Sequence, residues 1–271
     1  LGDVYKRQFF YSAYDAPADG KEYSNANENQ KVYYHKLGTE QSDDQLVFSD
    51  ERYPQRFFMA QPDEDSDLLF LYVEAAGNGQ GLYVKSLKKQ DAEFTCINDQ
   101  FDYSCGVVGV VKNKIYMMTN LGAPKGRLVV ADVKNPGSAN WKTVLPETSD
   151  VLSSVQIVNG KLVAVYDKDA SNHAYVYNLD GKLLHEVALP AVGTVSFNGS
   201  AKSKDVYYTF SSFVYPPTVY SYDIDKNVST VYSQPKVNFK PEDYVTEQVF
   251  FSSKDGTKVP MTLTYLSLIH I

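Results

Sequence analysis

The sequence predicts an all-β protein that forms part of a β-propeller, on three observations. A run of alternating apolar and other residues, ended by a polar turn, occurs five times. The five runs start at Val32, Leu82, Leu128, Ala174 and Val219, which lie 50, 46, 46 and 45 residues apart. Gly, Pro, Asn and Asp turns separate them, and no long segment has the i, i+3, i+4, i+7 apolar spacing of a helix. We therefore expect short strands and almost no helix.

Each repeat contains four strand-like runs, of which the run above is the third. A more apolar run precedes it, at residues 9–14, 68–73, 114–120, 161–166 and 205–213. A short run follows it, at 45–49, 93–97, 141–145, 185–189 and 229–233. A fourth run lies between repeats, at 56–60, 105–111, 151–158 and 194–198. A β-sandwich does not repeat one strand order at one period, whereas a propeller does. The sequence predicts about five four-stranded antiparallel blades, the first lacking its inner strand.

The strand order predicts which connections share one face of the propeller. In a blade, the connections from strand 2 to strand 3 and from strand 4 to the next strand 1 emerge on the same side. The 2→3 connections here are residues 74–80, 121–126, 167–172 and 214–217, and the 4→1 connections are 50–55, 100–104, 147–150 and 190–193. Irregular loops gathered on one face often line a binding site or an interface. The alternative is that each of these loops is an ordinary hairpin tip without a function.

Composition excludes several classes of function. The net charge of −7 argues against a nucleic-acid-binding protein, which would be basic. No run of about 18 apolar residues occurs, so no membrane span is expected. Cys96 and Cys105 make neither a disulfide framework nor a metal spacing, and we expect both to be free. We expect no metal site and no cofactor.

Motifs for catalysis are absent from the sequence. No G-x-S-x-G nucleophile elbow, H-E-x-x-H motif or phosphate-binding glycine loop occurs. His35 and His185 are expected to be exposed strand residues rather than general bases. The acidic string from Asp223 to Asn227 lacks the later Gly and Glu of a calcium loop, so we interpret it as a turn.

Four segments resemble the prolyl oligopeptidase family of serine peptidases. They are FFYSAYD (9–15), KVYYHKLGTEQSDD (31–44), TNLGAPKGRL (119–128) and YVTEQVFFSSKDGTKVPM (244–261), in the order of the family. The likeness covers nearly all of residues 9–265. Residues 1–8 and 266–271 fit neither flank and resemble translated adapter sequence, so we interpret both as non-native tails.

The resemblance implies a two-domain parent protein. Members of the family join a seven-bladed propeller to an α/β-hydrolase domain whose Ser, Asp and His cleave short peptides after proline. Residues 9–245 would be a partial propeller, and residues 246–265 would begin the hydrolase domain. The catalytic residues would lie downstream of Tyr265, so we expect this chain alone to be inactive. The resemblance implies a monomeric parent that needs no cofactor and takes short proline-containing peptides; the cytoplasm and the periplasm both remain open as its compartment.

The resemblance also gives three candidate substrate-binding positions: Arg56, Val73 and Ala76. Val73 stands where mammalian members have an arginine, and Ala76 stands where they have a cysteine. Arg56 could offer its cation to a substrate carbonyl or carboxylate. The alternative is a rim arginine paired with Glu51 or Glu74.

A non-catalytic propeller that serves as a binding scaffold is the alternative function. A predicted strand pair, joined by a tight polar turn from Ser253 to Thr257 within SSKDGTKVPM (252–261), distinguishes the two hypotheses, because a free-standing propeller would not need it.

Overall fold

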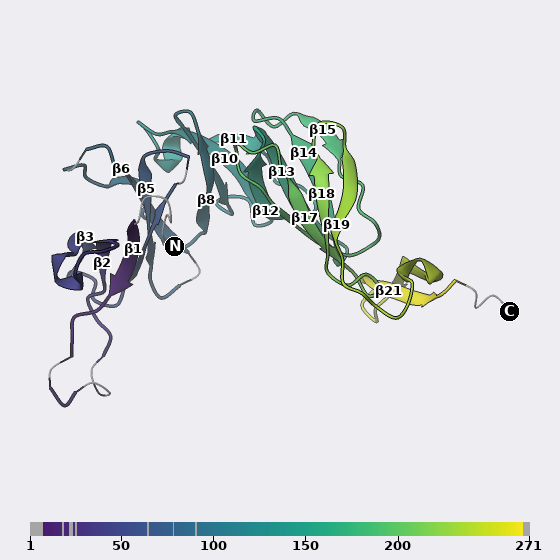
Figure 1. Cartoon of the computed structure of the whole chain (residues 1–271), viewed down its shortest axis with the longest axis horizontal. Helices are drawn as coiled ribbons and strands as arrows, with labels where there is room; N and C mark the ends of the chain where they lie inside the picture. The colour runs from purple at the N-terminus through teal and green to yellow at the C-terminus, as the bar shows by residue number, and fades with distance from the viewer. Residues whose placement is uncertain are drawn as a thin grey trace. The chain divides into compact units, whose positions relative to one another are not determined.

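A computed structural model describes residues 8–17, 19–21, 24, 26–63, 65–77, 79–89 and 91–267. The chain divides into two compact units, Leu1–Gly122 with Val129–Lys142, and Ala123–Leu128 with Thr143–Ile271. Strands dominate both units (Figure 1). The only helical segments in the described ranges are three single 3₁₀ turns, Gln41–Asp43, Ser138–Asn140 and Pro241–Asp243. The expectation of an all-β fold with almost no helix is confirmed.

Nineteen of the strands form five antiparallel sheets with the strands in chain order. The first sheet has three strands, β1 (Gln8–Ala13), β2 (Lys31–Lys36) and β3 (Gln45–Ser49). The second sheet is β4 (Phe57–Pro62), β5 (Leu68–Glu74), β6 (Gln80–Ser86) and β7 (Thr95–Asn98). The third is β8 (Cys105–Val111), β9 (Lys114–Thr119), β10 (Arg127–Asp132) and β11 (Lys142–Leu145). These sheets match the predicted quartets, and the described part of the first sheet has no inner strand, as expected.

The last two quartets complete the repeat. The fourth sheet is β12 (Val151–Val158), β13 (Lys161–Lys168), β14 (Ser171–Tyr177) and β15 (Leu183–Glu186). The fifth is β16 (Thr194–Asn198), β17 (Tyr207–Ser211), β18 (Thr218–Asp223) and β19 (Val228–Ser233). The predicted turn at residues 223–227 is confirmed, because the Asp223 carboxylate accepts from the backbone N–H groups of Asp225 and Lys226.

The central strand β5 is buried on both faces because its sheet packs against the sheet before it and the sheet after it. In β5, Phe70 and Tyr72 belong to one apolar cluster, whereas the alternating Leu71 and Val73 belong to another. Successive side chains of a strand point to opposite faces, so a strand covered on both sides is a continuous apolar run. This is why the run at residues 68–73 is continuously apolar instead of alternating with polar residues.

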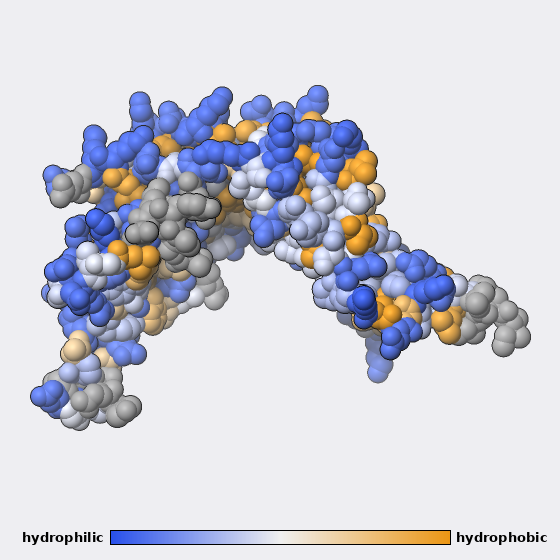
Figure 2. All heavy atoms as spheres, viewed as in Figure 1, coloured by the Kyte–Doolittle hydropathy of each residue, from blue (hydrophilic) through white to orange (hydrophobic). Residues whose placement is uncertain are grey.

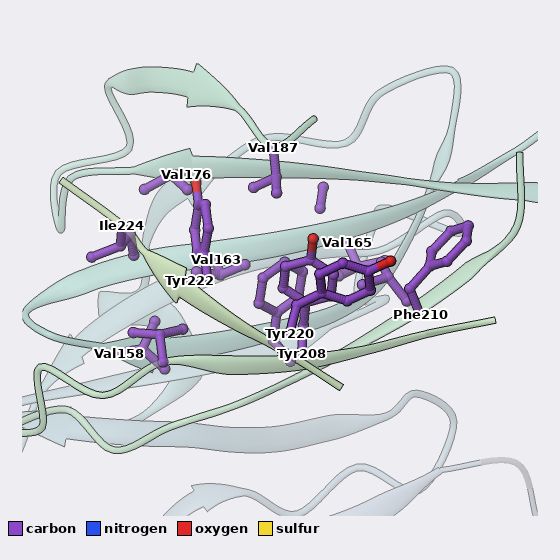
Figure 3. Close-up of a cluster of buried hydrophobic side chains, with 14 residues drawn as sticks. Val158, Val163, Val165, Val176, Val187, Tyr208, Phe210, Tyr220, Tyr222 and Ile224 are labelled. Atoms are coloured by element: carbon purple, nitrogen blue, oxygen red, sulfur yellow. The ribbon is translucent and has the colours of Figure 1, made fainter. Parts of the chain in front are cut away.

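The largest core cluster joins the fourth and fifth sheets (Figure 3). Val163 and Val165 of β13 pack with Tyr208 and Phe210 of β17, and all four are almost completely buried. The rings of Tyr208 and Tyr220 are stacked with their centroids 4.9 Å apart. Alternation along β17 places Tyr208 and Phe210 on the same face of the strand. We call this set of buried side chains the sheet 4–sheet 5 core.

A separate two-stranded ribbon follows the fifth sheet. It consists of β20 (Tyr244–Ser252) and β21 (Lys258–Leu266), joined by the predicted turn at Ser253–Thr257. The Ser253 N–H donates to the Thr257 carbonyl at 2.8 Å, and Gly256 takes a φ of 84°, a conformation that glycine adopts without strain. No residue of the ribbon is buried, and apolar side chains lie on its surface (Figure 2).

Candidate functional site

The 2→3 connections bond to the neighbouring 4→1 connections. In the first unit, the Gln80 N–H donates to the Tyr103 carbonyl at 3.3 Å, and Asn98 Nδ2 donates to the carbonyls of Gln80 and Gln100. In the second unit, the Lys125 N–H donates to Glu147 Oε1 at 2.6 Å. These contacts place the two kinds of connection on the same side of their sheets, as the strand order predicted.

A related contact ties the first, second and fourth sheets to the first strand of the sheet that follows, and we call it the inter-sheet clasp. The Phe58 N–H donates to Gln30 Oε1 at 2.6 Å, and the Val195 N–H donates to Asn172 Oδ1 at 2.8 Å. Gln80 Nε2 donates to the Cys105 carbonyl at 2.9 Å. Side-chain amides suit this position because they both donate and accept. The clasp therefore holds the seam between two successive sheets on the side where these loops lie.

Arg56 lies in the connection between β3 and β4, against two aromatic rings. Its guanidinium carbon is 3.6 Å from the centroid of the Tyr53 ring and 4.5 Å from that of Phe101. No ion pair joins Arg56 to Glu51 or Glu74, both of which are described residues, so the rim ion pair considered above is not formed. A guanidinium held on aromatic faces keeps its planar N–H edge available for an anion or a carbonyl oxygen.

The carboxylate close to Arg56, that of Asp50, is paired with another arginine, Arg52. A hydrogen bond from Arg52 holds the pKa of the Asp50 carboxyl below its usual value, and Arg56 adds to this effect. Burial raises the pKa of Tyr83, and the Arg56 cation opposes this shift. Because Asp50 makes two hydrogen bonds to the Arg52 side chain, at 2.8 and 3.0 Å, the neighbouring carboxylate belongs to Arg52 rather than to Arg56.

Val73 and Ala76 lie in different environments. Val73 is the sixth residue of β5, is only 2% exposed and packs with Val32, Phe58 and Leu71. Ala76 is exposed in the loop between β5 and β6. A ligand can reach Ala76 directly, whereas Val73 contributes to the packed layer beneath the loop.

Phe101 lies next to Arg56 and packs on the cluster that contains Val73, and sequence reasoning missed it. Besides contacting Arg56, its ring tip lies 3.2 Å from the point where a Cβ on Gly81 would be, and the Val73 Cβ lies 3.3 Å from the same point. The Phe101 carbonyl lies 3.4 Å from the corresponding point on Gly77, next to Ala76. The signal that could have identified Phe101 was present, since the 100–104 connection was predicted on the same face as Arg56.

His35 and His185 are half-buried and hydrogen-bonded, which corrects the expectation that they are exposed. His35 Nδ1 lies 2.6 Å from Asp44 Oδ1, and Tyr11 donates to the other oxygen of Asp44 at 2.7 Å. Loss of hydration opposes ionisation of Asp44, but these hydrogen bonds outweigh it and lower the pKa of the carboxyl. His185 Nε2 lies 3.0 Å from the Tyr222 hydroxyl, and burial lowers the pKa of this imidazole. His35 is therefore linked within the first sheet, through Asp44 to Tyr11 of β1. His185 links β15 of the fourth sheet to Tyr222 of β18 in the fifth.

A cavity of about 360 Å³ opens at the start of β14. His173 Nδ1 and Glu186 Oε1 are 3.3 Å apart at its edge, and the Ser171 hydroxyl donates to the Lys168 carbonyl. The hydroxyl is therefore not paired with the imidazole, and this cavity holds no activated serine. Its lining is Ser171, Asn172, His173, Glu186, Val187, Ala188, Leu189, Ala191 and Val192.

Other features of the described residues bear on function. Both cysteines are free; Cys96 is exposed, and burial raises the pKa of the Cys105 thiol to about 12. Across the described ranges, no three His, Cys, Asp or Glu side chains gather as metal ligands would. None of the described helical segments has the length and apolar character needed to cross a bilayer.

Repeated four-stranded antiparallel sheets, with loops of two kinds meeting at one edge, define a β-propeller segment. The family profile described as the N-terminal β-propeller domain of prolyl oligopeptidase matches residues 5–235. The chain therefore belongs to the prolyl oligopeptidase family, as its motifs indicated.

Individual relatives agree with this assignment. A prolyl endopeptidase from Elizabethkingia meningoseptica is 40% identical over 266 residues, which are 98% of this chain and 37% of that protein. A structure from a study of inter-domain dynamics in two prolyl endopeptidases matches with a TM-score of 0.82 at 32% identity, covering 97% of this chain and 38% of that one. Galerina marginata prolyl oligopeptidase B, bound to a 35mer hydrolysis and macrocyclization substrate, matches with a TM-score of 0.82 at 26% identity, covering 95% of this chain and 37% of that one. The chain thus spans little more than a third of the length of these relatives.

Proposed function

We propose that the chain is the access-limiting propeller of a serine endopeptidase that cleaves short peptides on the carboxyl side of proline. The carrying observation is that the propeller profile matches residues 5–235 while the chain spans 37% of a related prolyl endopeptidase. The catalytic Ser, Asp and His would lie in a hydrolase domain beyond this sequence, in a parent protein that works as a monomer. The propeller would admit peptides by size, and the hydrolase domain would perform the acyl transfer.

The proposed domain boundaries follow from the resemblance. Residues 9–245 would be the propeller, residues 246–265 the start of the hydrolase domain, and residues 1–8 and 266–271 non-native tails. Each proposed boundary falls at or within a strand. β1 starts at Gln8 and β21 ends at Leu266, next to the two proposed tails, and the boundary at residue 246 falls inside β20. The proposal that the ribbon belongs to a further domain is supported by its exposed apolar side chains, among them Phe250, Phe251 and Met261.

For the substrate, we propose that Arg56 donates to a peptide carbonyl or carboxylate, with Ala76 at the loop surface and Val73 in the layer below. The support is geometric, because Phe101 contacts Arg56, packs on the cluster that contains Val73 and lies near Gly77, the residue after Ala76. Arg56 also has neither Glu51 nor Glu74 as an ion-pair partner. Hydrogen bonds to a charged group contribute about 1.5–3 kcal/mol, so Arg56→Met in the full-length peptidase should lower kcat/KM about tenfold or more. Arg52→Met is the matched control, since Arg52 is paired with Asp50; equal losses in both variants would reject the role of Arg56.

The deciding experiment compares two proteins. The gene is first read beyond codon 265 for a G-x-S-x-G motif followed by Asp and His codons. The protein that includes this region should hydrolyse a Z-Gly-Pro chromogenic substrate and lose activity to a serine-directed phosphonate, whereas the 271-residue chain should not hydrolyse it. A stop codon, or an unrelated domain, would instead support the non-catalytic scaffold.

A further inference from the structure

Two Asn-Gly dipeptides lie side by side in the second unit. Asn159-Gly160 forms the turn between β12 and β13, and Asn198-Gly199 spans the end of β16, of which Asn198 is the last residue. The loop after Gly199 meets the first turn directly: the Asn159 N–H donates to the Ser200 carbonyl at 3.2 Å, and the Gly160 N–H donates to the Ala201 carbonyl at 3.0 Å. The same reactive dipeptide thus occurs in two conformations at one place.

An Asn-Gly sequence can modify itself. The backbone nitrogen of the glycine attacks the side-chain Cγ of the asparagine, and glycine allows this approach because no Cβ restricts its backbone. The attack needs a glycine N–H that is not engaged in a hydrogen bond and an asparagine side chain that can rotate. The two sites differ in both requirements.

Asn159-Gly160 is locked. Its residues take φ angles of 46° and 67° in a two-residue hairpin, closed by pairing of Val158 with Lys161. The Gly160 N–H, which would have to act as the nucleophile, is held by the Ala201 carbonyl. Reaction there requires breaking backbone hydrogen bonds and leaving the turn conformation.

Asn198-Gly199 is open. Asn198 is the last residue of β16 and is exposed, and no hydrogen bond from the described residues holds its side chain or the Gly199 N–H. Gly199 is required by packing rather than by its φ angle, because a Cβ there would lie 2.8 Å from Cγ1 of Val158. Close packing of two loops therefore demands the glycine that makes Asn198 reactive.

We propose that Asn198 deamidates spontaneously in the folded protein, while Asn159 is protected. A bond forms between the Gly199 nitrogen and Cγ of Asn198, the bond from Cγ to Nδ2 breaks, and ammonia leaves with the proton lost by the Gly199 nitrogen. Water then opens the succinimide to aspartate or isoaspartate. No oxidant or cofactor is needed.

Isoaspartate would loosen the local structure. It moves one side-chain carbon into the main chain at the residue that pairs with Tyr207, and so displaces the Ser200 and Ala201 carbonyls. Loss of these two acceptors frees the Asn159 and Gly160 amides. Ageing at Asn198 would thus weaken the contact between the fourth and fifth sheets on the side of these turns.

The test incubates the dilute folded chain at pH 8.5 in ¹⁸O water and maps peptides by mass spectrometry. Asn198 should convert at least about tenfold faster than Asn159, since the locked site must first lose backbone hydrogen bonds. In guanidinium chloride the two rates should become equal, which controls for local sequence. Equal rates in the folded chain, a faster Asn159, or no label at residue 198 would overturn the proposal.

A second measurement follows the consequence. After ageing, hydrogen exchange of the Asn159 and Gly160 amides should accelerate. An Asn198→Gln chain aged in parallel should keep its exchange rates, because the longer side chain disfavours ring closure. Faster exchange in this control, or unchanged exchange in the deamidated chain, would contradict the structural effect.

Discussion

The sheet 4–sheet 5 core and the β20–β21 ribbon are built from the same kind of sequence and have opposite environments. Both contain alternating aromatic and β-branched residues in regular antiparallel pairs. Phe210 in the core is fully buried, whereas Phe250 in the ribbon is 49% exposed. Strand pairing alone therefore does not create a core, because a second apolar face must also cover the first.

The largest expected effect separates the two regions directly. Phe210→Ala should reduce the free energy of unfolding by about 3–5 kcal/mol, because it leaves a cavity among packed side chains. Phe250→Ala, the matched change in the ribbon, should alter it by no more than about 0.5 kcal/mol. Guanidinium unfolding curves measure both changes, and similar losses would mean that the ribbon is packed in solution.

A smaller effect is expected at the inter-sheet clasp. Asn172→Ala removes the acceptor of the Val195 N–H, and an unpaired buried donor costs about 1–3 kcal/mol. Hydrogen exchange should accelerate at the Val195 amide, with a matching fall in the unfolding midpoint. The change Asn140→Ala at an exposed 3₁₀ turn is the control and should do neither. An unchanged Val195 amide would show that the clasp does not hold the seam.

The ribbon turn should respond locally rather than globally. Gly256 has a φ of 84° with open space around it, so Gly256→Ala adds only backbone strain of about 1–2 kcal/mol. Amides of β20 and β21 should exchange faster while the global unfolding midpoint stays unchanged. A lowered midpoint would show that the ribbon unfolds together with the sheets.

The smallest effect depends on pH. Burial lowers the pKa of His185 in the folded state from an ordinary value of 6.5, so the unfolded chain binds its proton first as pH falls. The stability contributed by the neutral imidazole is present above about pH 6.5 and is lost as pH falls through the lower, folded pKa. His185→Gln should therefore flatten the pH dependence of unfolding between pH 7.5 and 5. An identical slope in the variant would exclude this role.

Sequence reasoning identified strands well and contacts poorly. The run at residues 68–73 was recognisable as a central strand because both of its faces are apolar. The environment of Arg56 was only partly recognisable. The strand order placed the 100–104 connection on the same face, but it could not show that the Phe101 ring, 45 residues away along the chain, contacts the guanidinium. Likewise, nothing near His35 in the sequence marks Asp44 and Tyr11 as its hydrogen-bonded neighbours.

The strand order shared by the five sheets, the turn of the ribbon and the family could all be predicted from the sequence. Side-chain alternation, turn chemistry and short motifs are local properties of the chain. Three features were visible only in the folded chain: Phe101 packs beside Arg56 and Val73, side-chain amides link successive sheets, and one Asn-Gly dipeptide is locked while the other is open. These depend on which distant segments pack together, and packing is fixed by three-dimensional complementarity that residue spacing does not encode.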